Sequence, residues 1–161
     1  MGKRLGTGQI LFGSVQEGMN QTTQITATRL TYSGILPFLF FGIAKVMKFT
    51  GADYGFALCG YGTMIATFLC GIHWAVHLFF PDRCRRNLLI ISNLVTLLGY
   101  ATLFVPQQDI ALLIQSLCFA FLLWIDYEAL MQGIIPRWYF ELRRNATMAV
   151  ILVLVSVVSL S

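Results

Sequence analysis

Four ionisable side chains lie inside long apolar stretches of the sequence: His73, His77, Asp126 and Glu128. Ionisable groups are costly to bury in an apolar environment, so each of them marks a candidate functional position. A histidine beside a carboxylate can share a proton, hold a metal ion or bind a polar ligand. The sequence therefore directs attention to the place where these side chains could meet.

The stretch 54–80 carries a stripe of mostly small residues at spacings of three or four. Such spacing places them on one face of a helix, and small residues on one face are typical of helix packing. The two histidines of this stripe are therefore predicted to point into a helix bundle. The stripe consists of Gly55, Cys59, Thr63, Ala66, Cys70, His73 and His77.

Three kinds of bound group can be weighed at this stripe. A haem with two axial histidines needs imidazoles from opposite sides of its ring, whereas His73 and His77 lie one turn apart on the same helix face. This arrangement argues against a haem held by both histidines. Cys70, His73 and His77, with Asp126 opposite, are weak candidates for a metal site, since helical packing often produces this spacing, and we expect no metal or other cofactor. A quinone or lipid headgroup held by His73, Asp126 and Trp74 is the alternative to a His–Asp pair that only fixes helix packing.

Helix geometry places His73 and Asp126 at a similar depth. His73 lies about 10 Å inside the Phe80 end of its stretch, and Asp126 lies about five residues inside the end of its own. We predict that they contact each other directly or through one water, with Asn93 or Arg143 nearby. The candidate polar layer comprises His73, Trp74, Asn93, Asp126 and Arg143.

Glu128 is expected to behave differently from Asp126. Two residues along a helix turn the side chain by about 200°, and Glu128 lies nearer the helix end. It is therefore expected to reach the interface and Arg137, and the two carboxylates are not expected to form a catalytic pair.

The composition indicates a membrane protein. Of the 161 residues, 57% are hydrophobic and 11% are charged, whereas soluble domains have about 45–50% apolar and about 25% charged residues. The mean hydropathy is +0.74, and the four cysteines lack the paired spacing of a disulfide framework. The Lys and Arg residues behind the net charge of +4 lie at the ends of apolar runs. This placement indicates contact with membrane lipids and argues against a nucleic-acid partner.

Five apolar runs approach the roughly 20 residues that a helix needs to cross a bilayer. Their separators are short and carry turn residues or charges. The sequence therefore predicts an all-α integral membrane protein with a bundle of five transmembrane helices. The runs are about Thr31–Val46, Tyr54–Phe80, Leu88–Val105, Ile110–Met131 and Ala146–Leu160.

The last run, Ala146–Leu160, is only about 22 Å long as a helix, which is short for a bilayer. Pro136 suits a first helical turn, and Trp138 and Tyr139 suit the depth of the lipid headgroups. We therefore expect this helix to begin at Pro136, within about two positions.

Lys and Arg are unequally divided between the two sides of a five-span bundle. The side with the N-terminus and the second and fourth loops holds nine, and the other side holds only Lys45 and Lys48. The positive-inside rule then predicts a cytoplasmic N-terminus and a C-terminus outside. The nine residues are Lys3, Arg4, Arg29, Arg83, Arg85, Arg86, Arg137, Arg143 and Arg144.

The N-terminal residues differ from the rest of the chain. They are polar, with Gly, Gln and Thr clusters, and they lack the long apolar segment of a secretory signal. We expect a polar cytoplasmic tail over residues 1–28 and a five-helix membrane domain over residues 29–161.

Several motifs resemble those of a family of small multi-pass proteins with a domain of unknown function. The motifs are Gly34-Ile35-Leu36-Pro37-Phe38, Gly71-Ile72-His73-Trp74, Asp126, and Pro136-Arg137-Trp138-Tyr139 with Leu142-Arg143. The resemblance covers roughly residues 30–160, and the family occurs in proteobacteria and includes the mitochondrial transmembrane protein 69. It implies location in the bacterial inner (cytoplasmic) membrane, or in the mitochondrial inner membrane for a eukaryotic chain. It implies no activity, and its shared polar set is His73, Trp74, Asp126 and Arg143.

Two classes of function remain open. The first is a structural or assembly protein of the inner membrane, with membrane lipids and other membrane proteins as partners. The second is a site for a quinone, lipid or proton in the cytoplasmic half of the bundle. The sequence has no catalytic or nucleotide-binding motif, so we do not expect an enzyme. A pocket beside His73 would favour the second class, and a tightly packed His–Asp contact would favour the first.

Overall fold

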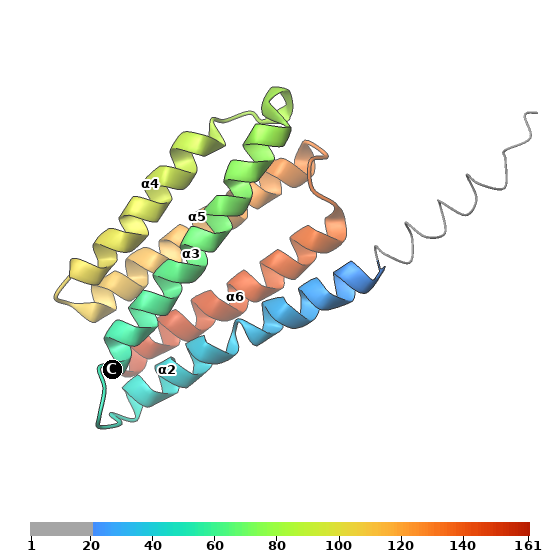
Figure 1. Ribbon diagram of the computed structural model, residues 1–161. Coiled ribbons are helices and arrows are strands. Elements are labelled where there is room, and N and C mark those ends of the chain that lie inside the picture. Colours follow the sequence, from blue (N-terminus) through green and yellow to red (C-terminus); the bar gives the residue numbers. More distant parts are fainter. Residues whose placement is uncertain (1–20) are drawn as a thin grey trace, which may run out of the picture. The chain divides into compact units, whose positions relative to one another are not determined.

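The computed structural model describes residues 21–161, which form helices joined by short connections and contain no strand (Figure 1). The chain divides after Gly34 into two units. In the first unit, residues 21–33 are helical. Helix thus covers the end of the stretch predicted as a tail, whereas residues 1–20 of that stretch lie outside the described residues.

The second unit, residues 35–161, contains five α-helices and two short 3₁₀ helices. The 3₁₀ helices are η1 (Pro81–Arg83), which follows α3, and η2 (Thr102–Phe104), which extends α4. The α-helices are α2 (Leu36–Val46), α3 (Tyr54–Phe79), α4 (Leu88–Ala101), α5 (Gln108–Met131) and α6 (Arg137–Leu160).

The starts of α3, α4 and α6 follow from residues that favour the N-terminus of a helix. Asp53 precedes α3 and accepts a hydrogen bond from the Phe56 amide at 2.9 Å. Asn87 caps α4 in the same way. Pro136 immediately precedes α6, so this helix begins at Arg137. The early start predicted for the last helix is therefore confirmed to within one residue.

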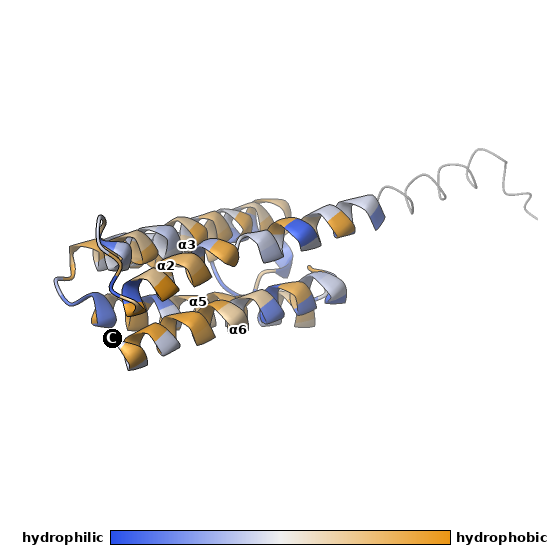
Figure 2. Cartoon of the chain, turned by 90° about the horizontal axis from the view of Figure 1, so that it is seen from below, coloured by the Kyte–Doolittle hydropathy of each residue, from blue (hydrophilic) through white to orange (hydrophobic). Residues whose placement is uncertain are grey.

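The helices have the apolar character that the composition predicted. In the described chain, four segments are long and apolar enough to cross a membrane: Gln21–Val46, Tyr54–Phe79, Gln108–Met131 and Arg137–Leu160. Leu88–Phe104 is a shorter apolar helix. Hydrophobic residues dominate the helices, and the connections are more hydrophilic (Figure 2). An all-helical protein with helices compatible with a membrane is therefore confirmed.

Helices α3 and α5 are in contact and run in the same direction. At their starts, the Gln108 side-chain amide donates to Asp53 Oδ1 at 2.8 Å. Farther along both helices, His73 Nε2 lies 2.8 Å from Asp126 Oδ1. Two such contacts at different heights require parallel helices. The chain must therefore return along the bundle between them, and α4 is the segment that does so (Figure 1).

The other helices flank this central pair. Helix α4 packs mainly on α3, α6 packs on α5, and α2 contacts both α3 and α6. Lys45 near the end of α2 pairs with Asp109 in the first turn of α5, so these two helices are antiparallel. The largest fully buried apolar side chains are Phe38, Phe119, Leu58, Leu112, Leu122, Ile125 and Leu154.

The Asp53 cap predicts a measurable dependence on pH. Hydrogen bonds from the Phe56 amide and the Gln108 side chain hold the pKa of Asp53 below its usual value. We expect Asp53→Ala to lower the free energy of unfolding in detergent by about 1 kcal/mol. Asp53→Asn keeps a capping oxygen and should lose less.

The sign of this pH effect follows from the lowered pKa. The stabilisation that the Asp53 charge adds over Asn is present above the unfolded pKa of about 3.9 and is lost as the pH falls through the lower folded pKa. Unfolding curves of the wild type and Asp53→Asn between neutral and acidic pH would show this convergence. A constant difference at every pH would contradict it.

Candidate functional site

Three polar side chains from three helices meet inside the bundle. His73 on α3 and Asp126 on α5 are each 3% exposed, and Arg143 on α6 is 8% exposed. His73 Nε2 lies 2.8 Å from Asp126 Oδ1. Arg143 donates from Nε at 3.1 Å and from Nη2 at 3.0 Å, both to Asp126 Oδ2. The predicted His73–Asp126 contact is confirmed, with Arg143 as the neighbouring cation.

Asp126 has a counterion within this cluster. A guanidinium keeps its proton in proteins, so Arg143 is a permanent counterion for the Asp126 carboxylate. His73 Nε2 lies 2.8 Å from the other carboxylate oxygen, Oδ1, and donates to it when Nε2 carries a proton. Each oxygen of the buried carboxylate is thus hydrogen-bonded, which is the condition for burying such a charge. The His73 Nδ1 atom is also buried and has no hydrogen-bond partner in the described structure.

Local sequence places each member of the cluster. The small residue Cys70 lies one turn before His73 and is buried with it, which lets α5 come close to α3. Asp126 shares the buried face of α5 with Leu122 and Ala129. Because α6 begins at Arg137, Arg143 lies about 9 Å into that helix, within reach of α5.

Two residues predicted for the same layer lie elsewhere. Trp74 is 42% exposed, because one residue beyond His73 the helix has turned away from the core by about 100°. Asn93 is exposed, and its side-chain amide donates to the Leu89 carbonyl of its own helix at 2.9 Å. The placement of Asn93 in the polar layer is therefore corrected. Ser92, one position earlier, is the residue that α4 buries.

The weak metal candidates also do not converge. Cys70 is buried and His77 is partly buried, and the buried Nδ1 atom of His77 has no hydrogen-bond partner in the part of the chain that the structure describes. Within residues 21–161, no three His, Cys, Asp or Glu side chains are grouped so that they could hold a metal ion. Cys70 and His73 both lie on the buried face of α3.

Glu128 has a different partner from the one predicted. Its Oε2 atom accepts a hydrogen bond from Arg86 Nε at 3.0 Å, whereas Arg137 pairs with Glu141 in its own helix. The connection after η1 folds back toward α5, and the Arg86 guanidinium lies 4.6 Å from the centre of the Trp124 ring. The expected Glu128–Arg137 pair is therefore corrected to Glu128–Arg86.

A second buried polar cluster, centred on Gln115, was not predicted. Gln115 is 1% exposed, and its Nε2 atom lies 2.8 Å from the Cys59 carbonyl, 3.0 Å from Thr63 Oγ1 and 2.9 Å from Thr102 Oγ1. Both threonine hydroxyls donate to the Gly99 carbonyl, at 3.0 and 2.6 Å. This cluster ties α3, α5 and the end of α4 together. The signal in the sequence was a single glutamine inside the apolar run 110–131.

Comparison with known proteins identifies a family but no activity. The model of a family described as a protein of unknown function, DUF3429, matches residues 23–159. No curated protein and no solved structure matches the chain. The match covers most of the sequence and includes all three residues of the buried cluster. The chain therefore belongs to this family of proteins of unknown function.

Proposed function

We propose that this chain is a multi-pass protein of an inner membrane with five transmembrane helices and a structural or assembly role. The proposed number of five transmembrane helices rests on the observation that α3 and α5 run in the same direction. Both helices are long enough to cross a bilayer, so two parallel crossings need a third segment that returns between them. Helix α4 with η2 supplies about 27 Å, close to the bilayer core of about 30 Å.

The distribution of charge supports a cytoplasmic N-terminus. In a five-span bundle, the α3–α4 and α5–α6 connections lie on one side together with the start of α6. This side carries Arg83, Arg85, Arg86, Arg137 and Arg144. The opposite side, where α2 ends, carries Lys45 and Lys48. The positive-inside rule places the arginine-rich side in the cytoplasm and the C-terminus outside.

The buried cluster supports a structural role. Asp126 is fully hydrogen-bonded between His73 and Arg143, so the contact holds α3, α5 and α6 together without a further ligand. The apolar groove between α2 and α6 is not lined by any of these residues. The resemblance to the family that includes mitochondrial transmembrane protein 69 supports a bacterial or mitochondrial inner membrane. With this role and location, the proposed partners of the chain are membrane lipids and other membrane proteins.

One observation favours a second candidate function. The Nδ1 atom of His73 is buried and has no hydrogen-bond partner among residues 21–161, and a buried imidazole nitrogen can accept a proton or a ligand hydroxyl. A site for a quinone, lipid or proton would use this atom. Stabilisation of the wild type by a quinol, and its loss in His73→Gln, would favour this second function over the purely structural one.

Reporter fusions test the proposed topology. We expect alkaline phosphatase fused after Ser161 or Gln107 to be active in a bacterial host, because both positions lie outside the cytoplasm. A fluorescent protein that folds only in the cytoplasm should be active after Gly133. Cytoplasmic activity at Ser161 would contradict the orientation, and identical reporter behaviour at Gln107 and Gly133 would contradict five spans.

A further inference from the structure

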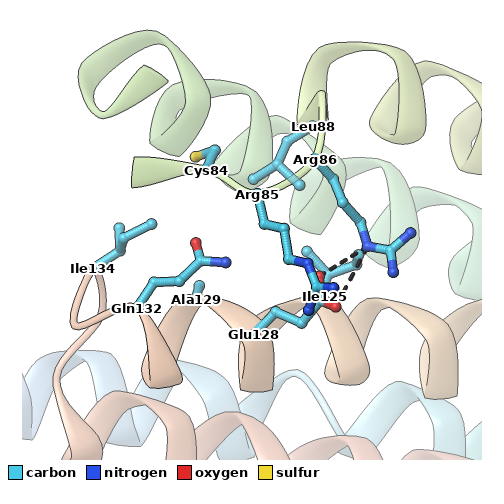
Figure 3. Close-up of a pocket in the computed structure, with 9 residues that line it drawn as sticks. All are labelled: Cys84, Arg85, Arg86, Leu88, Ile125, Glu128, Ala129, Gln132 and Ile134. Carbon is cyan, nitrogen blue, oxygen red and sulfur yellow. Dashed lines mark hydrogen bonds and ion pairs between the residues drawn. The ribbon is translucent and has the colours of Figure 1, made fainter. Parts of the chain in front are cut away.

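Two hollows in the surface of the described residues differ in the space that they offer. The one beside the Arg86–Glu128 ion pair (Figure 3) has a volume of only about 10 Å³, which is no more than one water needs. The other is an apolar groove between α2 and α6 with a volume of about 440 Å³, which lies in the range of small-molecule sites of about 300–1,000 Å³. The function proposed above assigns no role to this groove.

Exposed side chains at intervals of four residues form the walls of the groove. Helices α2 and α6 lie side by side (Figure 1), and each contributes one wall. Residues four apart lie above one another on a helix, so each wall is a ridge that runs along its helix. The walls consist of Leu39, Ile43 and Met47 on α2 and of Leu152, Ser156 and Leu160 on α6.

A glycine sets the floor between these two ridges. Gly42 on α2 and Val157 on α6 both line the groove and are buried. A Cβ atom at position 42 would lie 3.0 Å from Val157 Cγ2 and 3.3 Å from Val153 Cγ1. The missing side chain therefore lets the two helices meet closely at the floor, with an exposed apolar ridge on either side.

The length of the groove matches one leaflet of a bilayer. Its walls span residues 39–47 and 152–160, and each stretch is about 12 Å long as a helix, close to half of a bilayer core of about 30 Å. Residues 137–151, the first part of α6, do not line it. An acyl chain occupies one leaflet, whereas a transmembrane helix of a second copy that lay along α6 would need a surface about twice as long.

One end of the groove carries residues that suit the depth of the lipid headgroups. Lys48 directly follows Met47 and is exposed, and within residues 21–161 its side chain has no hydrogen bond or ion pair. The rings of Phe49 and Tyr54 contact each other nearby, with centroids 6.4 Å apart. Aromatic rings and lysines collect at the membrane–water interface. An unpaired lysine beside an apolar groove therefore complements a phospholipid, whose phosphate adjoins its acyl chains.

We propose that the groove between α2 and α6 holds one acyl chain of an anionic phospholipid, with the phosphate at Lys48. The proposal rests on the membrane location proposed above and deepens it by naming the lipid and the residues that bind it. The acyl chain lies lengthwise between the two ridges, over Gly42 and Val157. Ser156 has the smallest side chain in the walls, so a large side chain at this position would fill the groove.

Native mass spectrometry of the full chain in detergent with added phosphatidylglycerol measures how much lipid the protein retains. We expect the wild type to retain one lipid per chain, and Ser156→Phe to retain about fivefold less because its ring occupies the groove. Ser159→Phe is the matched control. Ser159 is also exposed on α6 but does not line the groove, so this variant should keep the lipid.

Lys48→Gln tests the headgroup end of the groove with a change outside the packed bundle. We expect the wild type to retain phosphatidylglycerol about fivefold better than phosphatidylcholine, and Lys48→Gln to remove most of this preference. Lys48 is exposed, so its substitution leaves the fold intact. This variant therefore keeps the proposal testable even if the ring of Ser156→Phe disturbs the packing of α6.

Three results would overturn the proposal. Equal retention by Ser156→Phe and Ser159→Phe would show that the lipid binds elsewhere. A wild-type dimer that only Ser156→Phe converts to monomers would assign the groove to a second copy of the chain. An unchanged preference in Lys48→Gln would exclude the phosphate from this end. Retention in detergent does not depend on orientation, so a wrong topology would show in the reporter fusions while the lipid effect persisted.

Discussion

Replacing Asp126 by Asn is expected to lower the free energy of unfolding in detergent by about 3–5 kcal/mol. The substitution keeps the shape of the side chain and removes its charge. Arg143, which is 8% exposed, then remains as a buried cation without a counterion. The cost of that unpaired charge, and not the loss of a hydrogen bond alone, sets the size of the effect. Thermal or chemical unfolding followed by circular dichroism would measure it.

The matched control for Asp126→Asn is Glu141→Gln. Glu141 also pairs with an arginine, but the side chains of Arg137 and Glu141 are 85% and 48% exposed. We expect this control to lose less than about 1 kcal/mol. Equal effects of the two substitutions would show that burial of the Asp126 pair does not matter for stability.

Adding one methyl group at Gly62 is expected to destabilise the bundle by about 1–3 kcal/mol. A Cβ atom at this position would lie 2.2 Å from Gln115 Oε1 and 3.1 Å from Gln115 Cδ. Gln115 cannot move aside freely, because its other amide atom bonds to Cys59, Thr63 and Thr102. Gly62→Ala should therefore force α3 and α5 apart or break these hydrogen bonds.

Gly60 offers a control on the same helix. A Cβ atom there meets nothing within 4 Å, so Gly60→Ala should be neutral or stabilising by up to about 1 kcal/mol through its higher helix propensity. Combining Gly62→Ala with Gln115→Ala removes the clash, and the pair should cost less than the sum of the two single changes. Similar melting temperatures for Gly60→Ala and Gly62→Ala would contradict the close α3–α5 contact at Gln115.

The positions of the helices could be predicted because each of α2 to α6 overlaps an apolar run. The second run was predicted at Tyr54–Phe80, and α3 spans Tyr54–Phe79. The start of α6 was predictable because proline fits a helix only at its beginning. The extent of α4 was less clear, because a 3₁₀ turn at Thr102–Phe104 ends it before the apolar run ends.

The central contact was predictable and its surroundings were not. His73 lies on a stripe of small residues, and Asp126 lies at a similar depth, so their meeting followed from helix geometry. Which face of α4 is buried could not be predicted in the same way, because Ser92 and Asn93 are adjacent polar residues in one apolar run. The structure buries Ser92, which is 2% exposed, and leaves Asn93 exposed.

Contacts made by connections were the least predictable. Glu128 had two basic segments within reach, and the choice depended on how residues 80–87 fold. The turn at Pro81–Arg83 brings Arg86 back over α5, and no periodic pattern in the sequence encodes that path. Gln115 was missed for another reason. A lone amide in an apolar helix belongs to no motif that indicates which residues it contacts.

The two buried polar clusters connect α3 and α5 at different heights in the bundle. Gln115 connects these helices near the side where α5 starts, and it includes the end of α4 through Thr102. Asp126 connects them near the arginine-rich side and includes α6 through Arg143. In a membrane, apolar packing between helices gains no hydrophobic driving force, so directional polar contacts of this kind fix which helices are neighbours.

The most direct test of this account is a double-mutant cycle of Asp126→Asn and Arg143→Met. The account predicts a coupling free energy of about 1–3 kcal/mol between the two residues. The double variant should also be more stable than Asp126→Asn alone, because it no longer contains an unpaired buried charge. Strictly additive effects, with the double variant the least stable of the set, would show that Asp126 and Arg143 do not act as a pair and would contradict the proposed structural role of the cluster.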